Sequence, residues 1–98
     1  MKSSLSRPWQ GAEALRVELE LRNLPSVRIM EYLAEAGGEP SGELAVSGEE
    51  WSAYLEPIEP AVVGAMRIPR DRLVITGHDS AVERISAFMR RKTMRGGG

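Results

Sequence analysis

Residues 15–22 read Leu-Arg-Val-Glu-Leu-Glu-Leu-Arg, an unbroken alternation of aliphatic and charged side chains. Successive side chains of a strand point to opposite faces, so this period of two predicts a strand with one apolar face and one solvent-exposed face. In a helix the same four aliphatic residues would be spread around the axis. The chain is therefore expected to build a sheet that is covered on one face only.

Two helices are expected to supply that cover. The first is predicted over residues 25–36, because Pro25 suits the first turn of a helix and Gly37-Gly38 suits its end. Apolar residues recur along it at helical spacing, which predicts a buried stripe of Val27, Met30, Leu33 and Ala34, widened by Ile29 and Ala36.

The second helix is predicted to begin at a capping box, Ser80-Ala81-Val82-Glu83, in which the serine and the glutamate each accept a hydrogen bond from a free backbone N–H. Its buried stripe is expected to contain Val82, Ile85 and Met89, with Phe88 at the margin.

Four short strands are predicted between the helices, over residues 44–46, 51–55, 62–68 and 73–76. The connections are too short for parallel crossovers, so neighbouring strands are expected to be antiparallel. Gly64, in the middle of one predicted strand, indicates a bulge or a bend. The order β-α-β-β-β-β-α predicts an α+β fold, a curved antiparallel sheet with both helices on one face.

The length and composition indicate one soluble domain. Of the 98 residues, 42% are hydrophobic and 28% are charged, a balance typical of globular proteins. We expect a flexible arm over residues 1–12, a single domain over 13–95 and a flexible glycine tail over 96–98. Neither a signal peptide nor an apolar run of about 20 residues is present, which predicts a cytoplasmic protein without a membrane span.

The scarcity of cysteine and histidine narrows the chemistry. The chain has no cysteine and one histidine, which excludes disulfides, thiolate metal sites and an all-histidine site. His78-Asp79 could form an acid–base pair, but its position before a helix favours a turn and cap. The acidic pairs Glu49-Glu50 and Glu56 with Glu59 are interpreted as solvated turn charges. We therefore expect neither an enzyme nor a bound metal or cofactor.

Charge is divided unevenly along the chain. Residues 1–60 contain 5 basic and 11 acidic side chains, a net charge of −6, whereas residues 61–98 contain 8 and 3, a net charge of +5. The C-terminal part is thus predicted to favour an anion or an acidic surface, unless the two halves interleave their charges in one globule. A pI near 5.9 and an aromatic content of 5% argue against nucleic-acid binding.

The candidate binding surface is a set of basic residues near the C-terminus. Guanidinium forks bind phosphate and carboxylate groups well. The alternative is that these residues compensate the helix dipole and pair with glutamates of the first half. The predicted anion- or partner-binding residues are Arg67, Arg70, Arg72, Arg90, Arg91, Lys92 and Arg95.

The chain ends in Gly96-Gly97-Gly98, after Arg95. A slender Gly-Gly terminus can enter the channel of an adenylating enzyme, as the tails of sulfur carriers do. A plain disordered end is the alternative.

From about Val27 to Gly98 the sequence resembles the C-terminal domain of MoaD-related proteins, in which a molybdopterin-synthase sulfur-carrier-like domain precedes a small α+β domain. The order and spacing of short motifs carry this resemblance: Glu31-Tyr32-Leu33, Gly37-Gly38, Glu59-Pro60, Val63-Gly64, Ile68-Pro69, Arg72-Leu73, Gly77, Glu83 and the closing Arg95-Gly96-Gly97-Gly98.

The resemblance implies a fold like one repeat of the TATA-box-binding protein. The leading 26 residues are too few for a sulfur-carrier domain, so the chain is expected to be a stand-alone copy. The resemblance also implies an accessory binding module of molybdenum-cofactor or sulfur-carrier metabolism. Its expected partner is a sulfur-carrier protein or the enzyme that activates that carrier. The alternative is a small-molecule binder with a pocket between sheet and helix, opened by Gly64 and the residues near Trp51. A homodimer is a further expectation.

Overall fold

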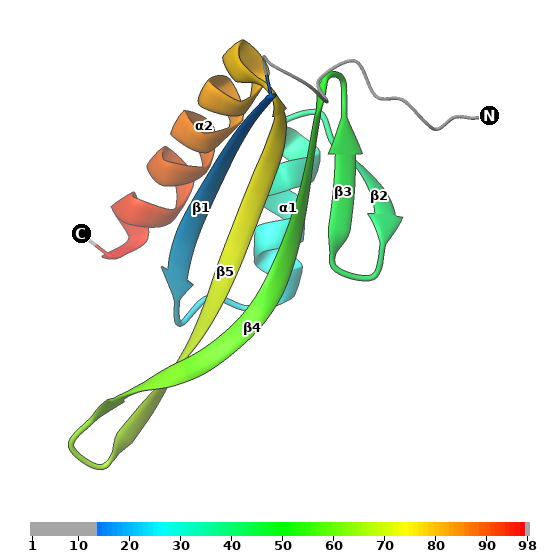
Figure 1. Cartoon of the computed structure of the whole chain (residues 1–98). Coiled ribbons are helices and arrows are strands. Elements are labelled where there is room, and N and C mark those ends of the chain that lie inside the picture. Colours follow the sequence, from blue (N-terminus) through cyan, green and yellow to red (C-terminus); the bar gives the residue numbers. More distant parts are fainter. Residues whose placement is uncertain (1–13, 98) are drawn as a thin grey trace.

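One five-stranded antiparallel sheet carries two helices on the same face (Figure 1). The computed structural model describes residues 14–97, with side chains up to residue 93, so the predicted N-terminal arm and Gly98 lie outside the described residues. The α+β class and the order β-α-β-β-β-β-α are confirmed. The elements are β1 (Ala14–Arg22), α1 (Ser26–Glu35), β2 (Glu39–Gly42), β3 (Ala45–Gly48), β4 (Trp51–Val63), β5 (Met66–His78) and α2 (Asp79–Gly97).

The core lies between the sheet and the helices. The strand order is β1-β5-β4-β3-β2, which places β5 between β1 and the long strand β4. The register pairs Leu19 with Leu73 and Leu73 with Leu55, so the predicted alternation of β1 continues across three strands. α2 packs against β1 and β5, and α1 packs against β2 and β3.

Helix α1 begins and ends close to the predicted residues. Pro25 is its N-cap, and the N–H groups of Gly37 and Gly38 donate to the carbonyl oxygens of Ala34 and Leu33. This pair of bonds is the Schellman pattern, which the positive φ of Gly37 (107°) permits.

The predicted stripe of α1 is partly wrong. Ile29 and Leu33, which are four residues apart, are the fully buried side chains, whereas Val27 is 64% exposed. Ala34 is exposed as well, so the buried face is centred on Ile29 and Leu33, one helical turn apart, with Met30 and Ala36 partly buried at its margin.

Helix α2 buries the predicted stripe. Val82, Ile85 and Met89 are completely buried, and Phe88 is partly buried at the margin of the core. The helix begins at Asp79, one residue before Ser80, so the predicted capping serine lies inside the first turn. Its hydroxyl contacts Nδ1 of His78 at 3.2 Å.

The strand boundaries between the helices were predicted wrongly. β4 and β5 are 13 residues each and form one long hairpin, in which the segments predicted as turns at 57–60 and 69–72 are strand. β3 pairs with β4 only as far as Tyr54, so Pro57 and Pro60 lie where β4 has a free edge. A proline can be accommodated at a free edge because it lacks the N–H that a neighbouring strand would need.

The predicted mid-strand bend at Gly64 is instead the hairpin turn. Val63 pairs with Met66, and Gly64, with a φ of +60°, is the first of the two turn residues between them. The bulge of this hairpin lies between Ile58 and Ala61, where two residues of β4 face one residue of β5. β2 was not predicted, because Glu39-Pro40-Ser41-Gly42 has no apolar alternation; it forms by pairing with β3.

Replacing Gly77 by alanine is expected to destabilise the fold by about 3 kcal/mol or more. Gly77 has a φ of +153°, and a Cβ there would collide with the carbonyl oxygen of Glu50 and lie 2.6 Å from Cα of Trp51. The check is the free energy of unfolding in urea. Gly37→Ala is the control: its φ is also positive, but nothing lies within 4 Å of a Cβ there, so a loss of only about 1 kcal/mol is expected. Equal losses would show that the collision at Gly77 is relieved without cost.

Candidate functional site

The face of the sheet that the helices leave uncovered, here called the open face, is occupied largely by charged side chains. Alternation along β1 and β5 sends leucines and isoleucine toward the helices and charges the other way. The register aligns Glu20 of β1, Arg72 of β5 and Glu56 of β4 in one row. The charged residues of this face are Arg16, Glu18, Glu20, Arg22, Glu56, Arg70 and Arg72.

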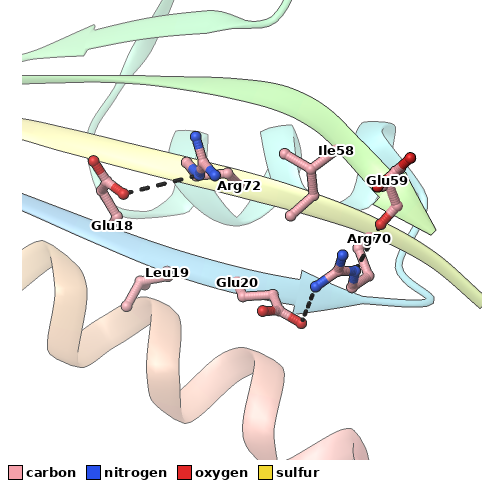
Figure 2. A pocket seen from close by; sticks show the side chains of 7 residues that line it. All are labelled: Glu18, Leu19, Glu20, Ile58, Glu59, Arg70 and Arg72. Atoms are coloured by element: carbon pink, nitrogen blue, oxygen red, sulfur yellow. Dashed lines mark hydrogen bonds and ion pairs between the residues drawn. The ribbon is translucent and has the colours of Figure 1, made fainter. Parts of the chain in front are cut away.

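Arg72 bridges three strands. Its Nη1 lies 3.0 Å from a carboxylate oxygen of Glu56, and its Nε lies 3.8 Å from one of Glu18 (Figure 2 shows the contact with Glu18). Glu18 in turn pairs with Arg16 at 2.8 Å. All these side chains are 40–53% exposed, so the network contributes little to stability for each pair.

Arg70 is held more tightly. Its Nε donates to the carbonyl oxygen of Glu59 at 2.7 Å and its Nη1 lies 3.4 Å from Glu20, as Figure 2 shows. Its side chain is 25% exposed. Arg22 also donates to Glu20 at 2.8 Å, and this bond first, then Arg70, lowers the pKa of the Glu20 carboxyl. Arg70 is thus engaged from both sides by its own chain.

These residues line a cleft of about 480 Å³ on the open face (Figure 2). Its walls contain three carboxylates and two guanidinium groups, and both guanidinium groups already contact carboxylates. The cleft therefore offers an anion no unpaired arginine. Its lining residues are Glu18, Leu19, Glu20, Ile58, Glu59, Arg70 and Arg72.

A second basic surface lies on α2. Arg84, Arg90 and Arg91 are exposed on the side of the helix away from its buried stripe. None of the described carboxylates pairs with them. Arg84 was not among the predicted binding residues, although its position seven residues before Arg91 places the two on one helical face. Together these three residues are called the α2 arginine face.

Lys92 does not belong to that face. Its Nζ lies 2.9 Å from a carboxylate oxygen of Glu35 and 5.6 and 5.5 Å from the ring centroids of Tyr32 and Phe88. These contacts join α2 to α1 through an ion pair and two cation–π interactions.

The predicted basic residues therefore do not form one patch. Arg70 and Arg72 are paired on the open face, Arg67 is exposed beside the β4–β5 turn, and Arg90 and Arg91 lie on α2. The side chain of Arg95 lies outside the described residues. Gly96 and Gly97 end α2, and the role predicted for the glycine tail stays a prediction.

His78 and Asp79 form the junction of β5 and α2. Nδ1 of His78 lies 3.3 Å from Oδ1 of Asp79, and the backbone N–H of His78 donates to the carbonyl oxygen of Glu50. Asp79 lies in the first turn of α2, where the helix dipole favours a negative charge. The predicted turn is absent here, because β5 ends at His78 and α2 begins at the next residue.

The other acidic residues give no metal centre. Glu49 and Glu50 are exposed before β4, and Glu56 is paired with Arg72. Within residues 14–93 no three acidic or histidine side chains gather closely enough to hold a metal ion.

The pocket predicted between sheet and helix exists, but at another place. Gly64 is at the hairpin turn and Trp51 is buried, so neither opens a space. A partly open, largely apolar cavity of about 150 Å³ lies between α1 and the β2–β3 hairpin. Its walls are Met30, Ala34, Gly38, Pro40, Gly42, Glu43, Ala45 and Val46.

Neither described helix is long and apolar enough to cross a membrane.

The model of one protein family, described as archaeal MoaD-like protein, matches residues 17–98. The match begins within β1 and extends beyond the region from Val27 in which the resemblance was found. No curated protein matches the chain.

The carboxyl of Asp71 is expected to make the stability of the fold depend on pH. Asp71 lies on the helix side of β5, opposite Leu21 and Pro57, and burial raises the pKa of its carboxyl above the usual value. The ionised form is therefore disfavoured in the fold, and stability is lost as the pH rises from the unfolded pKa of about 4 through the higher folded pKa. Asp71→Asn removes this cost, so its melting temperature is expected to exceed that of the wild type at pH 7.

The gain should disappear at about pH 3, where the carboxyl is protonated in both states. Asp79→Asn is the control, because the exposed Asp79 interacts favourably with the start of α2 and its loss should bring no gain. A lower melting temperature for Asp71→Asn at pH 7 would contradict the assignment.

Proposed function

This chain belongs to the archaeal MoaD-like protein family, and from that premise we propose that it is a non-catalytic, cytoplasmic binding module. It serves a molybdopterin or sulfur-carrier system by docking an acidic protein surface on the α2 arginine face. The partner is a sulfur-carrier protein or its activating enzyme.

The observation that carries this proposal is the division of the basic residues. Six of those described have a carboxylate partner within the chain, namely Arg16, Arg22, Arg28, Arg70, Arg72 and Lys92. Of the four described basic residues that have none, Arg84, Arg90 and Arg91 share one helix, and Arg67 lies beside the β4–β5 turn. Their guanidinium groups can bind a partner's carboxylates without first breaking an internal ion pair.

The physical consequence is an electrostatic docking mode. A cluster of like charges on one rigid helix accelerates association with an oppositely charged surface, and salt screens this attraction over about 8 Å at physiological ionic strength. The planar fork of arginine adds bidentate contacts that lysine cannot make.

Replacing the α2 arginine face by glutamate in R84E/R90E/R91E is expected to weaken binding to the sulfur carrier or its activating enzyme at least tenfold in Kd, because attraction becomes repulsion. The control R84K/R90K/R91K keeps the charge, so it should retain most of the affinity. Calorimetry at two salt concentrations measures both effects. Equal binding by the glutamate variant, or a wild type that binds neither partner, would refute the docking role.

The apolar cavity supports a second candidate function, the binding of a small apolar ligand. A cavity of about 150 Å³ is large enough for a benzene-sized group when its walls are apolar. Such a group would contact Met30 and Val46.

Benzene is therefore expected to shift the methyl resonances of Met30 and Val46, with saturation in the millimolar range. Ala34→Leu, at an exposed position on the cavity wall, should abolish the shift by filling the space. The control Ala87→Leu introduces the same side chain at an exposed site of α2. Unchanged methyl resonances in the wild type would exclude this second function.

A further inference from the structure

A groove of about 450 Å³ lies on the helix side of the sheet, at the end where β1 stops and α1 begins (Figure 1). Three parts of the chain form its walls. They are residues 23–26, which lead from β1 into α1, Leu44, which precedes β3, and the stretch of the β4–β5 hairpin that contains Pro57, Pro69 and Asp71. We call this feature the Asp71 groove. It is separate from the α2 arginine face and from the cleft on the open face.

Main-chain hydrogen bonds hold the walls of the Asp71 groove in place. The N–H of Asn23 donates to the carbonyl oxygen of Pro69 at 2.8 Å, which fixes the link between β1 and α1 to the hairpin. The N–H of Leu55 donates to the carbonyl oxygen of Leu44 at 2.9 Å and fixes the opposite wall. The proline rings add stiffness, because their φ angles are locked. A site that is formed in advance loses little conformational entropy when a ligand binds.

The walls are largely apolar. Leu24 and Leu44 are partly buried and pack against the core. Asp71 pairs with Leu21 and with Pro57, so these cross-strand neighbours share the helix side of the sheet with it. An alkyl chain in the groove would therefore be in contact with leucine and proline side chains.

One charged group lies among these apolar walls. Asp71 is the only ionisable residue among the described residues that line the groove, and no described residue forms a hydrogen bond or an ion pair with its carboxylate. The nearest arginines along β1 and β5 are Arg22 and Arg70, but alternation sends both to the open face, where they contact Glu20. The negative charge of Asp71 is thus half-buried and uncompensated within residues 14–93.

Such a carboxylate needs an explanation. An unpaired charge that is partly removed from water costs stability, and an uncharged side chain of the same shape would avoid this cost. Residues that cost stability and lie in a cleft are typical of binding sites. The ligand that compensates the charge of Asp71 is a cation, and the walls around it select one with an apolar body.

We propose that the Asp71 groove binds a small organic amine, whose ammonium group pairs with the Asp71 carboxylate while its alkyl chain packs against Leu24 and Leu44. An ammonium group has three N–H donors. Asn23 and Ser26, which also line the groove, have side-chain oxygens that can accept the remaining hydrogen bonds. The volume of the groove lies within the range of about 300–1,000 Å³ that is usual for small-molecule sites.

The first test uses n-butylammonium as the probe and the methyl resonances of Leu24 and Leu44 in the full chain at pH 7 as the readout. We expect saturable shifts with a Kd in the millimolar range. Asp71→Asn, which has the same shape without the charge, should raise the Kd at least about fivefold. The control Glu49→Gln removes an exposed carboxylate outside the groove and should leave the Kd unchanged.

Butyrate has an alkyl body similar to that of the probe but the opposite charge. It should not bind, although the start of α1 by itself would favour an anion. The absence of shifts in the wild type, an equal Kd for Asp71→Asn, or binding of butyrate as tight as that of butylammonium overturns the proposal.

The second test addresses the apolar walls. From ethylammonium to n-butylammonium, each added CH₂ should lower the Kd about threefold, because it is buried in the groove. Ser26→Phe should abolish the shifts by filling the groove, whereas Val27→Phe, at the next exposed residue, lies outside the lining and should retain them. A Kd that does not change with chain length, or that is unaffected by Ser26→Phe, would mean that the amine binds Asp71 without entering the groove, which overturns the proposal.

Discussion

The burial of β5 is the constraint on which the rest of the structure depends. Leu73 and Ile75 are completely buried on the helix side, where β1, β4 and α2 supply their neighbours. Burying one such side chain contributes about 1.5–3 kcal/mol, so this row is a substantial source of stability for the sheet. Strict alternation in β1 is needed to keep Leu19 opposite Leu73, since a shift of one residue would turn every aliphatic side chain to solvent. The fold class follows from that register.

The same alternation decides which charges are available to a partner. Because β1 and β5 must send every second residue to the open face, Glu18, Glu20, Arg70 and Arg72 are brought within reach of one another. Cross-strand pairing then neutralises the arginines of the sheet. α2 has no such constraint: its polar side faces solvent, and its described arginines, Arg84, Arg90 and Arg91, have no carboxylate partner within residues 14–93. The uneven charge of the chain is thus partly cancelled inside one globule and partly left on one helix, and the binding of an anion or an acidic partner by the remaining arginines stays a prediction.

Local patterns predicted the parts of the fold that depend on neighbours in sequence. The strand at residues 15–22, the span of α1, the stripe of α2 and the family were all predicted correctly. The long hairpin was not, because Pro57, Pro60 and Pro69 are typical turn residues, and they are tolerated in strands only because the edges beside them are free. The ion pairs of Arg72 with Glu56 and of Lys92 with Glu35 could not be predicted either, since each joins elements that are distant in sequence. Arg84 could have been found from its helical spacing. The likeness to a TATA-box-binding-protein repeat stays a prediction.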